Sequence, residues 1–177
     1  MFGERRPPHL SSLAAELRRL AGAHLLDELE ITEAETEHGR LRHRTIHHVW
    51  EEAMHRGDGV SATTRTGIIR GTVDFVGTDY ATVVRDDTAW DIRLDRSVLS
   101  RVHRSNAGGH TVIGGSRTFK ARLAEYEATG EPVSIILSWI EMRGRITVVA
   151  TDHVVVRDGP DPSTVPLELI DVIRRDL

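Results

Sequence analysis

Hydrophobic and polar positions along the chain follow two different periods. Near the start, leucines recur at helical spacing after Ser11 or Ser12, either of which is a plausible N-cap. This pattern predicts an amphipathic helix. The leucines on its apolar face include Leu13, Leu17, Leu20 and Leu25. A second helix is expected from about Leu41 to His55, so this region is either a hairpin of two helices or one long helix.

From Val60 onward the pattern alternates, which is typical of short strands separated by glycine and aspartate turns. The expected strands are Val60–Thr64, Ile68–Val76, Tyr80–Val84, Ala89–Leu94 and Val98–Val102. A helix from about Arg117 to Thr129 then precedes a second set of strands. These are expected near Val133–Ser138, Met142–Val149, His153–Arg157, Thr164–Leu167 and Val172–Arg174.

The chain contains an internal repeat. Residues 45–84 match residues 118–157 at a constant offset of 73 positions without a gap. The identical pairs include Thr45 with Thr118, Gly57 with Gly130, Gly71 with Gly144 and Asp79 with Asp152. Self-similarity at a fixed offset indicates a duplicated module.

We therefore predict four segments: an N-terminal helical segment 1–44, a first repeat 45–104, a Gly-rich linker 105–116 and a second repeat 117–177. Each repeat has only about 60 residues, near the lower limit for an independent hydrophobic core. We expect the repeats to pack on each other, on the N-terminal helices or on a second chain.

A helix followed by five short strands, one of them bent at a glycine, is the plan of a small SH3-like barrel. Each repeat resembles the Sm-like (LSm/Hfq) fold in this layout, with Gly71 or Gly144 followed eight residues later by Asp79 or Asp152. The whole chain is similar to an actinobacterial group with a helical N-terminus and two such barrels in tandem. The expected fold class is therefore α+β: N-terminal helices followed by two tandem barrels.

The resemblance implies rings formed by pairing of edge strands, and RNA binding at the inner face of the ring. In the first motif of the family, Asp79 and Asp152 match the aspartate. Thr82 and Val155 stand where an asparagine would contact a base. The resemblance to this particular group implies no specific function.

Charge is unevenly distributed along the chain. Residues 40–122 hold fourteen basic and nine acidic side chains, whereas the flanking segments are acidic and the whole chain carries a net charge of -4. A basic middle can mark a surface that binds nucleic acid. The candidate nucleic-acid contacts are Arg40, Arg42, Arg44, Tyr80, Arg101, Arg104, Arg117, Lys120 and Arg122. The alternative is an ordinary solvated surface, with Tyr80 capping a barrel.

Chemistry-bearing motifs are scarce. There is no cysteine, no long apolar run and no N-terminal apolar stretch of the kind found in signal peptides, so we expect a cytoplasmic protein. His43, His47, Glu51 and His55 recur at four-residue steps, but on the helix side opposite the apolar face, which favours solvated side chains over a metal site. Since phosphate-binding loops and nucleophile elbows are also missing, we expect no enzymatic activity, cofactor, metal or small-molecule substrate.

Two functional hypotheses remain. The first is a non-catalytic interaction or scaffold protein that binds a protein partner or associates with itself. Its candidate partner-helix contacts are Leu13, Leu17, Leu20 and Leu25, for which burial within the same chain is the alternative. The second is an RNA- or DNA-binding regulatory protein that uses the Arg-rich middle to contact phosphates.

Overall fold

The computed structural model describes residues 19, 39, 41–105, 108–109, 116–138 and 140–177. The chain divides into two compact units, Met1–Arg44 and Thr45–Leu177, and all the strands lie in the second. The predicted partner contacts Leu13, Leu17, Leu20 and Leu25 lie outside the described residues.

Two capped helices introduce the two halves of the second unit. Helix α2 spans Ile46–Arg56 and helix α3 spans Phe119–Thr129. In each, a threonine side chain accepts a backbone N–H of the first turn, and a glycine with positive φ ends the helix. Helix α2 begins at Ile46 rather than at Leu41, because Thr45 adopts an extended backbone and acts as the N-cap. No helix in the described part of the chain is long and apolar enough to cross a membrane.

Five strands follow each helix, within a few residues of their predicted positions. After α2 come β1 (Gly59–Thr64), β2 (Gly67–Val76), β3 (Tyr80–Arg85), β4 (Thr88–Arg93) and β5 (Val98–His103). After α3 come β6 (Pro132–Leu137), β7 (Glu141–Val149), β8 (His153–Arg157), β9 (Pro162–Pro166) and β10 (Ile170–Asp176). One short 3-10 turn precedes the last strand of each half, at Leu94–Arg96 and at Leu167–Leu169.

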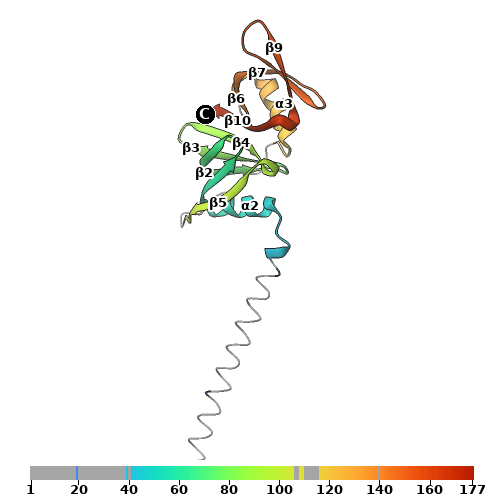
Figure 1. Cartoon of the computed structure of the whole chain (residues 1–177). Coiled ribbons are helices and arrows are strands. Elements are labelled where there is room, and N and C mark those ends of the chain that lie inside the picture. The colour runs from blue at the N-terminus through green and yellow to red at the C-terminus, as the bar shows by residue number, and fades with distance from the viewer. Residues whose placement is uncertain (1–18, 20–38, 40, 106–107, 110–115, 139) are drawn as a thin grey trace, which may run out of the picture. The chain divides into compact units, whose positions relative to one another are not determined.

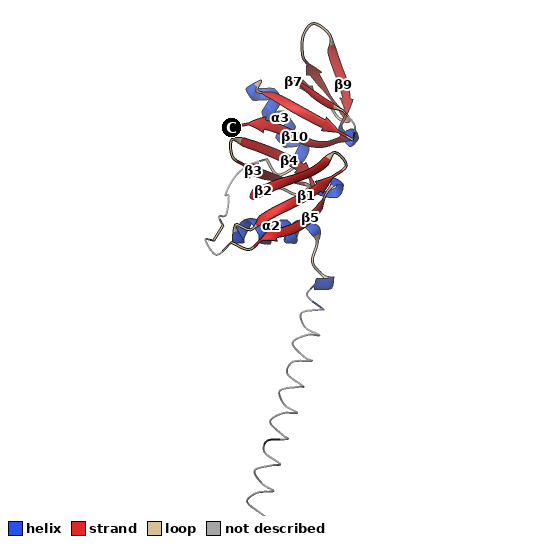
Figure 2. Cartoon of the chain, turned by 60° about the vertical axis from the view of Figure 1, so that its left-hand side comes forward, coloured by secondary structure: helices blue, strands red, loops and turns tan. Residues whose placement is uncertain are grey.

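All ten strands belong to one antiparallel sheet, ordered β5-β1-β2-β3-β4-β10-β6-β7-β8-β9. The prediction of an α+β fold with two separate five-strand barrels is therefore wrong, and the class is mainly β. The hydrophobic pattern locates each strand, but it does not say which strand occupies the second edge of β4. That edge pairs with β10, so the two sets of strands form a continuous sheet (Figures 1 and 2).

Two hydrophobic clusters lie beneath this sheet, and each takes residues from both halves. One surrounds Trp50 of α2 and includes Val172 of β10. The other surrounds Leu123 of α3 and includes Tyr80 of β3. Because each cluster crosses the boundary between the halves, we treat Thr45–Leu177 as one folding unit.

Gly71 and Gly144 occupy equivalent positions where backbones approach closely. A Cβ atom at Gly71 would lie 2.3 Å from the carbonyl oxygen of Val84, and one at Gly144 would lie 2.8 Å from that of Arg157. Any side chain would therefore push the neighbouring strand away, which explains why both halves carry glycine here.

Candidate functional site

The candidate site is the junction between the two halves. We use this name for the β4–β10 pairing together with the contacts of α3 against β3 and β4. The strands pair from Ile92 with Val172 to Thr88 with Asp176. The pairing continues past the strand ends, where the Leu177 N–H donates to the Asp87 carbonyl at 2.8 Å. The junction is thus an edge-to-edge contact inside one chain.

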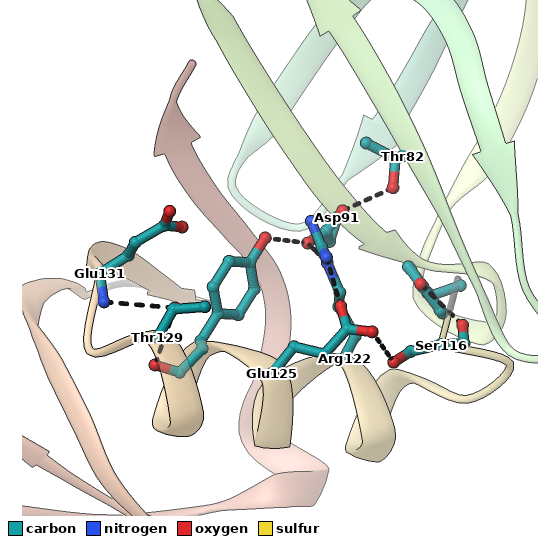
Figure 3. A network of polar contacts seen from close by, with 9 residues as sticks. Thr82, Asp91, Ser116, Arg122, Glu125, Thr129 and Glu131 are labelled. Carbon is teal, nitrogen blue, oxygen red and sulfur yellow. Dashed lines mark hydrogen bonds and ion pairs between the residues drawn. The ribbon is translucent and has the colours of Figure 1, made fainter. Parts of the chain in front are cut away.

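A buried carboxylate on β4 holds α3 in place. Asp91 is 1% exposed and accepts hydrogen bonds from Thr82 Oγ1 at 2.6 Å, from Arg122 Nε at 3.0 Å and from the Tyr126 hydroxyl. Thr82 lies on β3, and Arg122 and Tyr126 lie on α3. Figure 3 shows Arg122 projecting from the helix toward Asp91. We call Asp91, Thr82, Arg122 and Tyr126 the Asp91 cluster.

The electrostatics of this cluster favour the ion pair. Burial alone would lower the pKa of Arg122, but the charge of Asp91 outweighs it and the pKa is raised, so the guanidinium stays charged. Burial, reinforced by the Asp91 charge and its hydrogen bond, raises the pKa of Tyr126, so its hydroxyl stays protonated and donates. The guanidinium carbon of Arg122 also lies 4.7 Å from the centre of the Tyr126 ring.

Glu125 extends this network toward the surface of α3. It pairs with Arg122 and accepts a hydrogen bond from the Ser116 hydroxyl (Figure 3). Burial acts to raise the pKa of Glu125, but the hydrogen bonds from Ser116 and Arg122 outweigh it and hold the pKa below its ordinary value.

The loop between β2 and β3 holds the start of α3. Asp79 Oδ1 accepts the backbone N–H of Phe119, the first residue of the helix, at 2.7 Å. Beside it, the Tyr80 ring lies between Phe75 and Phe119, with ring centres 5.6 Å and 6.0 Å apart. One loop of the first half therefore both caps the second helix and packs against it.

The equivalent surfaces at the two ends of the sheet do not carry the Asp91 cluster. At an offset of 73 positions, Val49 corresponds to Arg122, Ala53 to Tyr126 and Thr164 to Asp91. None of these three can form the buried ion pair. Ile46 corresponds to Phe119 and is 45% exposed, and Val148 corresponds to Phe75 and is 44% exposed.

Asp152, the counterpart of Asp79, caps no helix within the described residues. Its carboxylate instead lies 2.7 Å from Nδ1 of the neighbouring His153, which corresponds to Tyr80. That hydrogen bond lowers the pKa of Asp152, whose side chain is otherwise open to solvent.

Among the described strands, β5 and β9 have a neighbour on one side only. Directly after β9, the Leu167 N–H donates to the Asp152 carbonyl, so the backbone of Leu167 faces β8. Every second residue of an antiparallel strand turns its backbone N–H and C=O groups to the same side. The outward row of β9 is therefore Pro162, Thr164 and Pro166, and Thr164 alone has an N–H to donate in this row.

The matching row of β4 shows what β9 lacks. Leu94 N–H donates to the Asp79 carbonyl, so Ala89, Asp91 and Arg93 turn their backbones toward β10. All three retain an N–H. Prolines thus replace the two end residues of the row that pairs in the junction, at Pro162 for Ala89 and Pro166 for Arg93.

Strand β5 has no proline, and its outward row follows from the β1–β2 hairpin. The hairpin closes on the pair Thr64–Gly67, so the backbone of Thr64 faces β2 and that of Thr63 faces β5. Since Thr63 pairs with Val98, the outward polar groups of β5 are those of Leu99 and Arg101. We call this edge the open edge.

The predicted nucleic-acid contacts that the structure describes lie on several different elements and loops of the chain. Arg42, Arg104, Arg117 and Lys120 are exposed, and Lys120 Nζ donates to the Thr151 carbonyl at 3.1 Å. Arg44 is half-buried, Arg101 lies in β5 and Arg40 is outside the described residues. Of the predicted contacts that the structure describes, Arg122 lies in the Asp91 cluster and Tyr80 in the hydrophobic cluster around Leu123.

Two of those predicted contacts have a different role. Tyr80 is 1% exposed and its hydroxyl donates to the Ser116 carbonyl at 2.9 Å, so its ring has no face free for a base. Arg122 is mostly buried and already paired with Asp91 and Glu125, so it is not available for a phosphate. Sequence spacing missed this because Asp91, the buried partner of Arg122, comes from β4.

Other possible sites are weaker. No group of three or more potential metal ligands occurs within the described residues, and His47 pairs with Glu51 at 3.4 Å. An open hollow of about 340 Å³ lies along β7, β8 and the loop before β9, with Glu141, Arg143, Asp158 and Asp161 on its rim.

Neither a scan against models of known protein families nor a search of curated proteins found a match for this chain. The resemblance to the Sm-like fold therefore stays a prediction from the sequence.

Proposed function

We propose that the protein is a non-catalytic interaction protein that binds another protein chain along the open edge of its sheet. The observation that carries this proposal is the contrast between β5, which has no proline, and β9, which has two in its outward row. We also infer that the two halves are copies of one module, since they share the order of elements and the positions of caps and glycines.

An unpaired strand offers a row of N–H and C=O groups to an extended segment of another chain. Along β5 these groups belong to Leu99 and Arg101. Exposed apolar side chains lie next to the edge. Val98 of β5, which is 65% exposed, pairs with Thr63 of β1, and Thr63 pairs with Ile68 of β2, which is 57% exposed. Backbone pairing and an adjacent apolar row together favour binding by strand addition.

The absence of catalysis is part of the proposal. The charged groups with shifted pKa values at the junction, Arg122 and Glu125, are paired with each other, and Arg122 also binds Asp91. These contacts fix a helix on a sheet, so they support a structural role for Arg122 and Glu125 rather than a role as an acid or a base.

A proline at the open edge tests the proposal. Arg101→Pro removes one outward N–H from β5 without removing an N–H that faces β1, and Arg101→Ala is the matched control that removes only the side chain. Tagged full-length variants are used to capture proteins from the native lysate, with and without nuclease. Circular dichroism confirms that each variant is folded.

We expect the wild type and Arg101→Ala to retain the same protein after nuclease treatment, and Arg101→Pro to lose it. Equal capture by Arg101→Pro contradicts binding at β5. If all associated material disappears with nuclease, the alternative of a nucleic-acid-binding protein is favoured, and its affinity should then fall steeply with salt.

A further inference from the structure

We infer that the partner of the open edge is a second copy of this chain, paired β5 to β5 across a two-fold axis. This inference rests on the proposed function, because it names the occupant of the same edge.

Head-to-tail assembly would repeat the junction between chains, with β9 of one copy against β5 of the next. Two observations oppose it. Pro162 and Pro166 remove the end donors of the outward row of β9, leaving one N–H where β4 has three. The residues that would replace the Asp91 cluster, Thr164 against Val49 and Ala53, cannot form its ion pair.

A two-fold contact uses β5 alone, since an isologous interface places the same surface on both subunits. In an antiparallel pair, two residues opposite each other either both turn their N–H and C=O groups toward the partner strand or both turn them away. In a symmetric β5–β5 pair, the two-fold axis must therefore pass through a residue position rather than between two positions. An axis at Ser100 pairs Leu99 of each copy with Arg101 of the other. An axis at Arg101 would instead place two arginines opposite each other, which is unfavourable.

The dimer formed in this way closes on itself. Both copies have used their open edge, and the remaining edges are the two β9 strands with their prolines. Growth beyond two chains is therefore not expected. In each copy, the exposed Val98 and its cross-strand neighbours Thr63 and Ile68 form a row that lies next to the β5–β5 contact.

The absence of cysteine from the chain allows a direct test. In the proposed register Ser100 faces itself in a pair without hydrogen bonds between the strands, where Cα atoms lie about 4.5 Å apart. This separation is within the range that a disulfide spans. Ser100→Cys is compared with Ser163→Cys and with an equal mixture of the two variants. If β9 of one copy paired with β5 of the next as β4 pairs with β10, Ser163 would lie opposite Ser100, as Trp90 lies opposite Arg174.

The mass of the full-length wild type in solution is measured first, by sedimentation over a range of concentrations. We expect twice the mass of one chain, and a single-chain mass for Arg101→Pro. Under mild oxidation, Ser100→Cys should form a covalent dimer and Ser163→Cys should remain a single chain.

Cross-linking between Ser100→Cys and Ser163→Cys in the mixture overturns the inference in favour of head-to-tail assembly. A single-chain mass for the wild type at every concentration overturns it as well. In that case the proposed function still stands if Arg101→Pro loses a captured protein, so the two failures are distinguishable.

Discussion

The junction and the ends of the sheet are built from equivalent positions of the two halves, yet within the described residues the buried Asp91–Arg122 ion pair occurs at the junction and has no equivalent at the ends. At the junction, Asp91 binds Arg122 and Tyr126, and Asp79 caps α3. At the ends, Val49, Ala53 and Thr164 replace Arg122, Tyr126 and Asp91, and β9 carries prolines. Asp152, the counterpart of Asp79, caps no helix within the described residues. The two halves therefore pair with each other at the junction. Of the two outer edges of the sheet, β5 is suited to pairing with another strand and β9 is not.

The largest expected effect comes from breaking the Asp91 cluster. Asp91→Ala leaves the buried guanidinium of Arg122 without its main partner and the Tyr126 hydroxyl without an acceptor. Removing one partner of a buried ion pair costs roughly 3–5 kcal/mol, so the free energy of unfolding should fall by about that amount. Urea unfolding measures this.

Asp95→Ala is the matched control for that change. Asp95 pairs with Arg93 at 2.9 Å, but its side chain is 55% exposed, so we expect a loss below about 1 kcal/mol. A loss of similar size in the two variants would contradict the structural role of the Asp91 cluster.

A slightly smaller effect separates Phe119 from its counterpart Ile46. Phe119 is 3% exposed and packs on Tyr80, so Phe119→Ala should destabilise the fold by about 3 kcal/mol. Ile46 is 45% exposed, so Ile46→Ala should cost well under about 1 kcal/mol.

Ile46→Ala also sharpens the comparison of the two modes of assembly. A two-fold β5 contact leaves Ile46 outside the pairing, whereas a head-to-tail contact would bury it as the junction buries Phe119. We therefore expect sedimentation to give the same dimerisation constant for Ile46→Ala and the wild type. A marked weakening of the dimer would point to the head-to-tail contact.

The smallest effect concerns pH. Because the pKa of Glu125 is held below its ordinary value in the folded chain, Glu125 contributes stability above the unfolded pKa of about 4.3. This stability is lost as the pH falls through the lower folded pKa. Glu125→Gln should therefore reduce the acid-side loss of stability, by at most about 1 kcal/mol because the side chain is 41% exposed.

That variant is compared with the wild type by thermal unfolding between pH 3 and pH 7 at constant ionic strength. The gap between the two unfolding curves should be widest at neutral pH and should close in acid. A gap that widens as the pH falls would contradict the direction of the Glu125 shift.

The sequence predicts the local elements well because their signals are local. Thr118 and Gly130 mark the ends of α3, and alternation locates strands such as Tyr80–Arg85. It fails at the Asp91 cluster, where Arg122 is 31 residues from Asp91 and no spacing rule joins a helix to a strand that precedes it. The same limitation produced the wrong prediction of two barrels, since nothing local to β4 specifies β10 as its neighbour.

The prolines of β9 are different, because their signal was available in the sequence. A proline within a strand pattern indicates an edge strand, and two prolines spaced by four fall on the same side of the strand. Which side they occupy became clear only from the hydrogen bond between Leu167 and Asp152. The prolines thus indicate an edge strand from the sequence alone. The backbone hydrogen bonds of the structure are needed to show that they lie on its unpaired side.

Hydrogen exchange at single amides tests most directly whether β5, and not β9, is the edge that associates. At high protein concentration, we predict slow exchange for the amides of Leu99 and Arg101 and fast exchange for that of Thr164. Dilution should speed exchange at Leu99 and Arg101 alone. Fast exchange at these two amides, together with concentration-dependent protection of Thr164, would contradict the assignment of β5 as the open edge.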